Sequence, residues 1–136
     1  AVEVVLAEAI DAFVSISRAT PDHTRPVRRA MEYLRERLAD AITLDDLAAY
    51  AELDKFHLCR AFRRQIGLPP HAYLTRLRIV RAKTLLLGGT RASDVAPLVG
   101  LYDQAQLTRH FRRIVGTTPA RYARAATPFG LLVSRS

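Results

Sequence analysis

Two stretches of the chain repeat one pattern of residues at an interval of 49 positions: DKFHLCRAFRR over residues 54–64 and DQAQLTRHFRR over residues 103–113. The repeat extends beyond these stretches and includes apolar and polar positions. The matched pairs are Asp54 and Asp103, Leu58 and Leu107, Arg60 and Arg109, Phe62 and Phe111, Arg63 and Arg112, Arg64 and Arg113, Gly67 and Gly116, Pro70 and Pro119, and Tyr73 and Tyr122. A general preference for helix does not explain why glycine, proline and tyrosine recur at the same 49-residue interval. The chain is therefore expected to contain two similar structural units.

Each repeated stretch is predicted to be a helix with one buried face, because its apolar residues recur at helical spacing. Asp54 and Asp103 each stand just before their helix and can cap its free amides. Gly67 and Gly116 follow and can adopt the left-handed conformation that ends a helix. The residues expected to face inward are Leu58, Phe62 and Ile66 in the first copy and Leu107, Phe111 and Ile114 in the second.

A short helix and a tight turn are expected before each repeated helix. Thr43 and Asp46 form a capping-box pattern at the start of the first short helix, which ends near Ala51. Thr90 or Ser93 is expected to start the second. A short helix, a tight turn and a second helix form a helix-turn-helix unit, so the chain is predicted to contain two such units.

The rest of the chain also has a helical pattern, and no alternating strand pattern of useful length occurs. Further helices are predicted over 1–18, around 27–38, from Pro70 to Leu87 and around 120–125. The predicted fold class is all-α, with two helix-turn-helix subdomains joined by a long connecting helix and an extra N-terminal helix. The expected divisions are an N-terminal helix and linker over 1–25, a first subdomain over 26–69, the connecting helix over 70–88, a second subdomain over 89–126 and a tail over 127–136.

Positive charge is concentrated in the later part of the chain. Residues 1–54 carry 11 acidic and 6 basic side chains, whereas residues 55–136 carry 15 Lys and Arg against two Asp. The later part therefore has a net charge of +13 in a chain whose formal charge is +8. This asymmetry indicates a polyanionic partner. On charge alone, a solvated basic surface without a partner is the alternative.

Composition limits the class of protein further. Hydrophobic residues make up 49% of the chain, which is enough for a buried core. No apolar run is long enough to cross a bilayer, so no membrane partner is expected. Cys59 is the only cysteine, which excludes an internal disulfide and a multi-cysteine zinc site and favours a cytoplasmic location.

The repeated helices carry a polar and basic face opposite their apolar residues. In a major groove, arginine can bond the O6 and N7 atoms of guanine, glutamine can bond adenine, and further arginines can hold phosphates. Two such helices could reach successive major-groove segments of double-stranded DNA, about one turn apart. The predicted DNA-binding residues are Phe56, Cys59, Arg60 and Arg63 in the first helix and Gln104, Ala105, Gln106, Thr108, Arg109 and Arg112 in the second.

The segments LDDLAAYAELDKFHLCRAFRRQIGLPPHAYL, RIVRAKTLLLGG and VAPLVGLYDQAQLTRHFRRIVGTTPARY resemble, in order and spacing, the DNA-binding domain of AraC/XylS-type transcription regulators. The resemblance covers roughly residues 26–124, and GLYDQAQLTRHFRRIVGTTPARY is its most specific part. It implies two helix-turn-helix subdomains, recognition helices over 54–66 and 103–115 in adjacent major grooves, and activation through contacts to RNA polymerase.

The same resemblance has implications for single residues and for the parent protein. Members of the family usually carry a separate sensor or dimerisation domain, and residues 1–18 resemble its last helix or a linker. The chain would then be a fragment of a longer regulator, and a small-molecule effector is expected only if such a domain exists. The base-reading positions carried over from the family are Phe56, Cys59, Arg60, Gln104, Ala105, Gln106 and Arg109.

Three features depart from the family pattern. Glu52 stands where the first turn usually has a small residue, often glycine, and a positive φ there would cost roughly 1 kcal/mol. Pro97 is benign in the first turn of the second short helix but would kink its interior. Cys59 and Ala105 have little hydrogen-bonding power, so apolar contact, such as with a thymine methyl, is expected there. More sequence specificity is therefore expected from the second helix.

Other functions remain as alternatives to DNA recognition. A helical protein-interaction or RNA-binding module could use the same basic face. No enzymatic activity, metal or cofactor is expected, because the histidines lack metal-ligand spacing and Cys59 lacks a nearby acid–histidine pattern. Redox sensing is an alternative role for Cys59. Arg78, in the connecting helix, is expected to pair with an acid near the interface of the two units.

Overall fold

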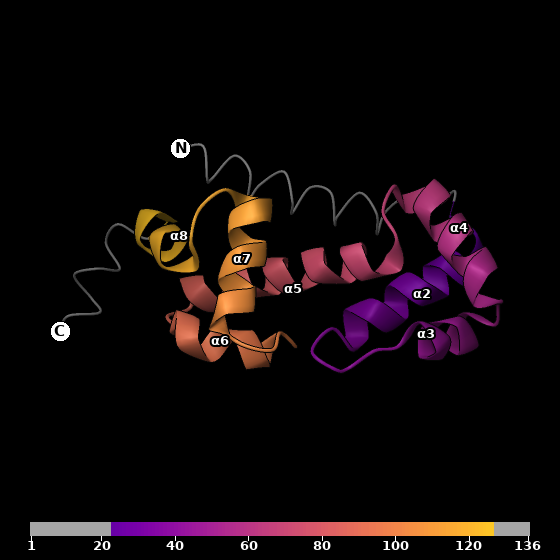
Figure 1. The fold of residues 1–136 in the computed structure, drawn as a ribbon, viewed down its shortest axis with the longest axis horizontal. Coiled ribbons are helices and arrows are strands. Elements are labelled where there is room, and N and C mark those ends of the chain that lie inside the picture. Colours follow the sequence, from indigo (N-terminus) through magenta and orange to yellow (C-terminus); the bar gives the residue numbers. More distant parts are fainter. Residues whose placement is uncertain (1–22, 127–136) are drawn as a thin grey trace.

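The computed structural model describes residues 23–126, which form seven α-helices and no strand within that range (Figure 1). The predicted all-α class is confirmed for these residues. The helix predicted over residues 1–18 and the tail over 127–136 lie outside the described part. The helices are α2 (Arg25–Glu36), α3 (Leu44–Ala51), α4 (Lys55–Ile66), α5 (Pro70–Leu87), α6 (Ala92–Leu98), α7 (Gln104–Val115) and α8 (Pro119–Ala126).

The helices form two units that share α5, which runs along the length of the molecule (Figure 1). One cluster of buried residues joins α2, α3 and α4 to the first half of α5, and a second joins the other half to α6, α7 and α8. The two helix-turn-helix units and the connecting helix predicted from the sequence are therefore present. From α5, the first cluster receives Tyr73, Leu74 and Leu77, and the second receives Ile79, Ala82 and Leu86.

The sequence repeat is also a repeat of side-chain packing. Phe62 of α4 contacts Tyr73 of α5 edge to face, with ring centroids 5.4 Å apart. Phe111 of α7 contacts Tyr122 of α8 in the same way, again at 5.4 Å. Both phenylalanines are fully buried. The phenylalanine and tyrosine of each copy thus form the same contact, which ties the repeated helix to the helix that follows it.

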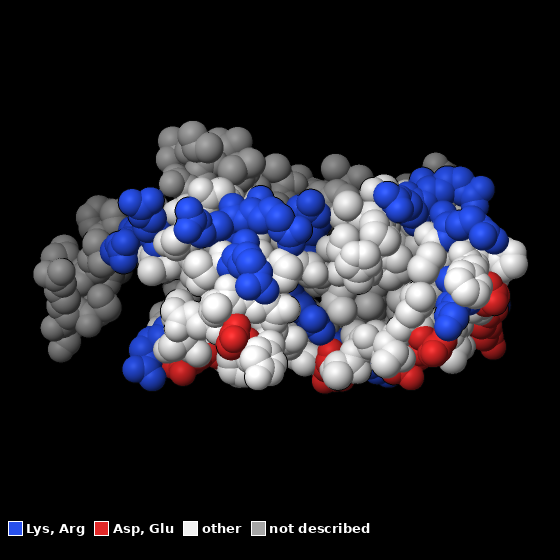
Figure 2. Space-filling model, in the orientation of Figure 1, with Lys and Arg blue, Asp and Glu red and all other residues white. Residues whose placement is uncertain are grey.

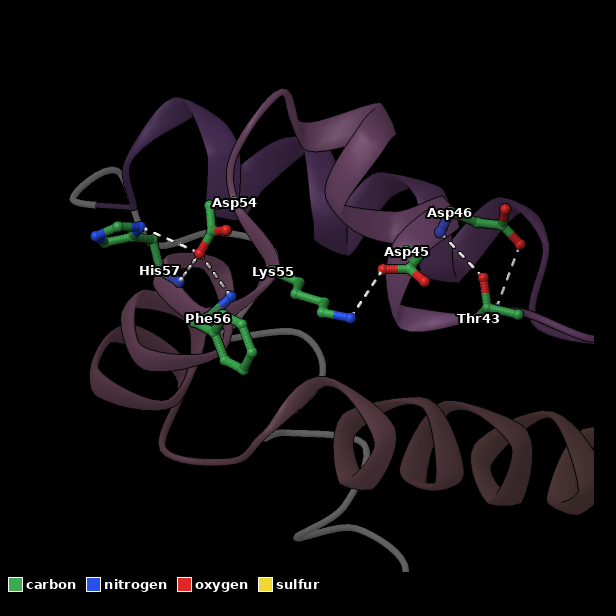
Figure 3. Close-up of polar contacts among 7 residues, drawn as sticks. All are labelled: Thr43, Asp45, Asp46, Asp54, Lys55, Phe56 and His57. Carbon is green, nitrogen blue, oxygen red and sulfur yellow. Dashed lines mark hydrogen bonds and ion pairs between the residues drawn. The ribbon is translucent and has the colours of Figure 1, made fainter.

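The predicted start of α3 and the predicted ends of α4 and α7 are confirmed. Asp46 donates its amide to Thr43 Oγ1 at 3.0 Å, and its carboxylate accepts from the Thr43 amide at 3.4 Å, so the capping box at the start of α3 is complete (Figure 3). Gly67 ends α4 with φ of 90°, and Gly116 ends α7 with φ of 99°. Local sequence signals therefore determine where these helices begin and end.

Glu52 adopts the left-handed conformation that its position in the turn suggested. It follows α3 with φ of 57° and ψ of 45°, and it is the only residue other than glycine with positive φ in the described part. Its carboxylate lies 3.7 Å from Arg29 Nη1 on the surface of the unit. An exposed ion pair of this kind contributes little, so it does not offset the backbone cost.

Glu52→Gly is expected to raise the free energy of unfolding by about 0.5–1 kcal/mol, because glycine has no Cβ to strain this conformation. Urea unfolding followed by circular dichroism measures the change. Glu52→Ala is the matched control: it removes the ion pair, keeps the strained backbone and should stay within about 0.5 kcal/mol of the original chain. Equal stability of the glycine and alanine variants would contradict the assignment of strain.

The start of the second short helix differs from the prediction. Neither Thr90 nor Ser93 caps it: α6 begins at Ala92, with Arg91 in the capping position and without a side-chain hydrogen bond to the backbone. The amide of Thr90 instead donates to Leu85 O at 3.0 Å, which makes Thr90 part of the turn that closes α5. The way α5 ends thus sets which residue stands in the capping position of α6. The presence of a serine or threonine near the start of α6 does not indicate this.

Two further positions refine the prediction for the second unit. Pro97 is the next-to-last residue of α6, not a residue of its first turn. Proline has no backbone N–H to donate to the preceding turn, and α6 ends one residue later. Val115 is fully buried, whereas Ile114 is half-buried against the same cluster. In the repeat, Val115 is the counterpart of Ile66, which is also buried. Aligning the second copy with the first therefore predicts the buried residue at this end of α7 correctly.

Arg78 is structural, as predicted, but its partner is not an acid. Its Nε donates to Leu38 O at 2.6 Å, and its Nη2 donates to Asp40 O at 2.9 Å. Both acceptors belong to the loop between α2 and α3. The prediction of an acidic partner was wrong because backbone carbonyls, which every residue carries, give no signal in the sequence.

Candidate nucleic-acid interface

The first predicted recognition helix, α4, begins at a capping aspartate (Figure 3). Asp54 Oδ1 accepts the backbone amides of Phe56 at 3.0 Å and His57 at 3.2 Å. The hydrogen bond from the His57 amide is the main cause that holds the pKa of the Asp54 carboxyl below its ordinary value. The charged cap thus fixes the first turn of α4 and the direction of the side chains that leave it.

Lys55 connects this first turn to the preceding helix. Its Nζ lies 3.3 Å from Asp45 Oδ1 on α3 and 5.7 Å from the centroid of the Phe56 ring (Figure 3). Phe56 is 65% exposed, so it is a surface residue at the start of α4 rather than part of the core. Its ring can make apolar and stacking contacts with a partner but cannot donate or accept a hydrogen bond.

The other predicted residues of α4 lie in different surroundings. Arg60 and Arg63 are exposed, whereas Cys59 is half-buried. Cys59 lines a cavity of about 150 Å³ together with Leu47 of α3 and Pro70 of α5. It therefore borders the packed interior of the first unit, and the exposed face of α4 consists mainly of Phe56 and the arginines.

The second predicted recognition helix, α7, has a more elaborate first turn. Asp103 Oδ1 accepts the amide of Gln106 at 2.8 Å, which confirms Asp103 as the cap. Gln106 Oε1 in turn accepts the amide of Tyr102 at 2.6 Å. The Gln106 side chain thus helps to close the turn, and its amide nitrogen is the part that can still donate to a partner. The sequence indicated a reader at this position but not this second task.

Five of the six residues predicted on α7 meet at one place. They line a single open depression and are Gln104, Ala105, Thr108, Arg109 and Arg112. Gln106, the sixth predicted residue, does not line it. The depression offers amide, hydroxyl and guanidinium groups beside the methyl group of Ala105. This combination can bond base edges and phosphates while still accommodating an apolar group.

His110 is a residue beside the predicted site that the motif comparison did not identify. Arg113 Nη2 lies 2.7 Å from His110 Nδ1. Burial lowers the pKa of the His110 imidazole, and the positive charges of Arg113, Arg109 and Arg78 lower it further. Both effects favour the neutral ring, whose Nδ1 can accept a hydrogen bond from Arg113. The spacing of three residues on one helix was the available signal.

Figure 2 shows how charge is distributed over one face of the molecule. Lys and Arg gather along the upper edge in two groups, one over α4 and one over α7, while Asp and Glu gather along the lower edge. Both predicted recognition helices therefore present positive charge on the same side of the molecule. The exposed arginines of α4, α7 and α8 are Arg60, Arg63, Arg64, Arg109, Arg112, Arg113, Arg121 and Arg124.

Comparison with known families completes this description. The profile of a helix-turn-helix domain of the AraC type matches residues 47–125, more than half of the chain, from within α3 to within α8. The chain belongs to the AraC-type helix-turn-helix family of transcription regulators. For an AraC-type domain, the duplicated helix-turn-helix units described above are the expected architecture.

Individual relatives agree with this assignment. The AraC-type chain is 37% identical over 94 residues to YbfI, an uncharacterised HTH-type transcriptional regulator of Bacillus subtilis; the match covers 69% of this chain and 34% of YbfI. It is 27% identical over 108 residues to AarP, an HTH-type transcriptional activator of Providencia stuartii, covering 79% and 80% of the two chains. The chain thus spans about a third of the length of YbfI but most of AarP.

A solved structure has the same fold. The DNA-binding domain of AdpA, a global transcriptional factor crystallised in complex with a target DNA, matches the AraC-type chain with a TM-score of 0.72 and 28% identity. The match covers 77% of this chain and 96% of that domain.

The described part of the AraC-type chain contains neither a group of metal-ligating side chains nor a membrane-spanning helix. Within residues 23–126, no three or more His, Cys, Asp and Glu side chains are placed so that they could hold a metal ion. Across the same residues, no helix is both long and apolar enough to cross a membrane.

Proposed function

We propose that this AraC-type chain binds double-stranded DNA in a sequence-specific manner and is the DNA-binding part of a transcription regulator. In the proposal, α4 and α7 enter adjacent segments of the major groove. The structure of the AdpA domain in complex with a target DNA supports double-stranded DNA as the partner. That domain has the same fold and is 28% identical in sequence to this chain.

One observation carries the proposal: two equivalent, aspartate-capped helices present arginines on the same side of an elongated molecule (Figures 1 and 2). Phosphates attract such a surface regardless of sequence, and a helix in the major groove can then read base edges. Because α5 joins the two units, a single chain could read an asymmetric site, where a protein with one unit needs a dimer.

The side chains are proposed to share this work unequally. Gln104 and Arg109 can form hydrogen bonds with base edges, while Arg63 and Arg112 are suited to phosphates. Phe56 supplies apolar contact at the start of α4. The complete proposed set is Phe56, Cys59, Arg60 and Arg63 on α4 and Gln104, Ala105, Gln106, Thr108, Arg109 and Arg112 on α7.

Competition between two duplexes tests the proposed function. A labelled duplex enriched from a random pool is bound by the chain, and unlabelled copies of either the same duplex or a random duplex are added. The enriched duplex should compete about 10³-fold better or more, the ratio typical of specific over non-specific binding. Equal competition would sink DNA sequence recognition and favour a protein-interaction or RNA-binding role for the basic face.

Replacing two arginines of α7 separates base reading from phosphate binding. Arg109→Ala is expected to remove preference at one base pair, a loss of about 1–3 kcal/mol of discrimination, because a bidentate contact to one base disappears. Arg112→Ala, one turn along the same helix, should weaken all duplexes nearly equally. Affinities for every single-base variant of the enriched site give both results, and an even loss from Arg109→Ala would refute its role as a reader.

The regulatory outcome is proposed to be activation through contact with RNA polymerase. AarP, which has 80% of its length matched by this chain, is described as a transcriptional activator. Control by a small-molecule effector is proposed only for a longer protein with a sensor domain. No enzymatic activity forms part of the proposal.

A further inference from the structure

The two units contact each other at a second place besides the shared helix α5. There the loop between α2 and α3 from the first unit meets α5 and the turn that follows α6 in the second unit. We call this contact the brace; it consists of Leu38, Ala39, Asp40, Arg78 and Gly100. It joins segments that are far apart in the sequence and contains none of the proposed DNA-binding residues.

Arg78 holds the loop to α5 with two separate donors. Its Nε bonds Leu38 O at 2.6 Å and its Nη2 bonds Asp40 O at 2.9 Å, so one rigid guanidinium spans two carbonyls of the same loop. The side chain is half-buried, and burial lowers the pKa of its guanidinium. Its positive charge also lowers the pKa of His110, which places Arg78 within electrostatic reach of α7.

Gly100 brings the second unit against the backbone of the same loop. A Cβ added to Gly100 would lie 2.9 Å from the Cα, carbonyl carbon and carbonyl oxygen of Ala39. Backbone atoms cannot rotate away as a flexible side chain can, so only glycine permits this approach. The φ of Gly100 is 84°, which also favours glycine.

Apolar packing continues across the same contact. Leu38, whose carbonyl accepts from Arg78, is packed against the buried clusters of both units. Val80 of α5 also packs against both clusters. The brace therefore combines directional hydrogen bonds, a close backbone approach and apolar contact, and these together resist rotation of one unit against the other.

We propose that the brace fixes the separation and rotation of α4 relative to α7 and thereby determines the spacing between the two half-sites that the chain accepts. This inference rests on the proposed function. One inserted base pair rotates the second half-site by roughly 35° about the duplex axis, since B-DNA completes a turn in 10–10.5 base pairs. A rigid joint cannot follow that rotation, whereas a loosened joint can.

A spacing series tests the proposal directly. The enriched duplex is shortened or lengthened by one base pair between the segments read by α4 and α7. The original chain should lose about tenfold or more in affinity for either altered spacing, since it can no longer engage both segments at once. Arg78→Ala should bind the best spacing more weakly but lose no more than about threefold on changing it. Arg78→Lys should behave like Arg78→Ala, because an ammonium group cannot span both carbonyls.

This readout separates positioning from stability. A variant that is only less stable would lose the same factor at every spacing and keep the profile of the original chain. An unchanged profile in Arg78→Ala would therefore overturn the role of the brace, even if overall affinity fell.

Two glycine variants form a matched pair for the other half of the brace. Gly100→Ala introduces both the unfavourable φ and the contact with Ala39. Gly89→Ala introduces an unfavourable φ of 98° in open space, with nothing within 4 Å of the new Cβ. Only Gly100→Ala should shift or broaden the spacing profile. The same profile for both variants would contradict a role for the contact between Gly100 and Ala39.

A measurement without DNA distinguishes failure of the brace from failure of the proposed function. Spin labels are attached at Arg64→Cys and Arg113→Cys in a Cys59→Ser background, and their distance distribution is recorded in the free chain. Arg78→Ala should broaden it. An equally narrow distribution would refute the brace whatever the chain binds. A broadened distribution together with no preference of the original chain for any duplex would refute the proposed function and leave the brace standing.

Discussion

Phe111→Ala is expected to lower the free energy of unfolding by about 3–5 kcal/mol, the usual cost of removing a fully buried aromatic side chain. Phe111 has no exposed surface and packs edge to face against Tyr122 in the core of the second unit. Small domains are typically stable by about 5–15 kcal/mol, so this loss is a large part of the total. The second unit should unfold at much lower urea concentration.

Urea titration followed by circular dichroism and by tyrosine fluorescence measures this loss. Tyr102→Ala is a suitable control, because Tyr102 is 90% exposed and its removal should change stability by less than about 0.5 kcal/mol. Phe62→Ala, the equivalent change in the first unit, should cost a similar amount because its contact with Tyr73 has the same geometry. A cost below about 1 kcal/mol for Phe111→Ala would contradict the packing described for the second core.

Raising the salt concentration from 50 to 200 mM is expected to weaken binding to duplex DNA about 10³-fold. Eight arginines on α4, α7 and α8 are exposed. If about six of them neutralise phosphates, the logarithm of the binding constant falls with a slope of about −5 against the logarithm of salt concentration. The loss comes from counterions that binding releases from the duplex, so it should apply to random and specific DNA alike.

Fluorescence anisotropy titrations at several salt concentrations give this slope. Arg112→Ala should reduce its magnitude by about one, since one phosphate contact is removed. Arg91→Ala is the control: Arg91 lies outside the recognition helices, is exposed and pairs with Asp94 at 3.1 Å, and its removal should leave the slope unchanged. A slope near zero for the original chain would show that the basic surface does not contact phosphates.

The sequence predicts those parts of the structure that depend on local signals. The capping residues Thr43, Asp54 and Asp103 are found as expected because a cap acts on amides only two or three residues away. The repeat adds information that one copy lacks: it aligns residue 115 with Ile66 and so identifies the correct buried position. The left-handed conformation of Glu52 is expected from its place in the turn, which Gly100 occupies in the second unit. These two residues lie 48 positions apart, so the 49-residue repeat does not itself pair them.

Contacts that depend on tertiary structure are not predictable in this way. The partners of Arg78 are backbone carbonyls 38 and 40 residues away, which no residue type marks. The bond between Gln106 Oε1 and the Tyr102 amide assigns a capping task to a residue that looked like a base reader. Cys59 lines a cavity only because residues of α3 and α5 lie close to it in the folded chain. In each case the signal lies in how separate segments pack, not in the segment itself.

The central claim is that one chain reads two neighbouring major-groove segments with α4 and α7, and selection from a random pool of duplexes tests it most directly. The enriched sequences should contain two blocks of preferred bases whose centres are about 10–10.5 base pairs apart. In a second selection with Arg109→Ala, one preferred position should disappear from only one block. Enrichment of a single block, or no enrichment over the starting pool, would contradict the account.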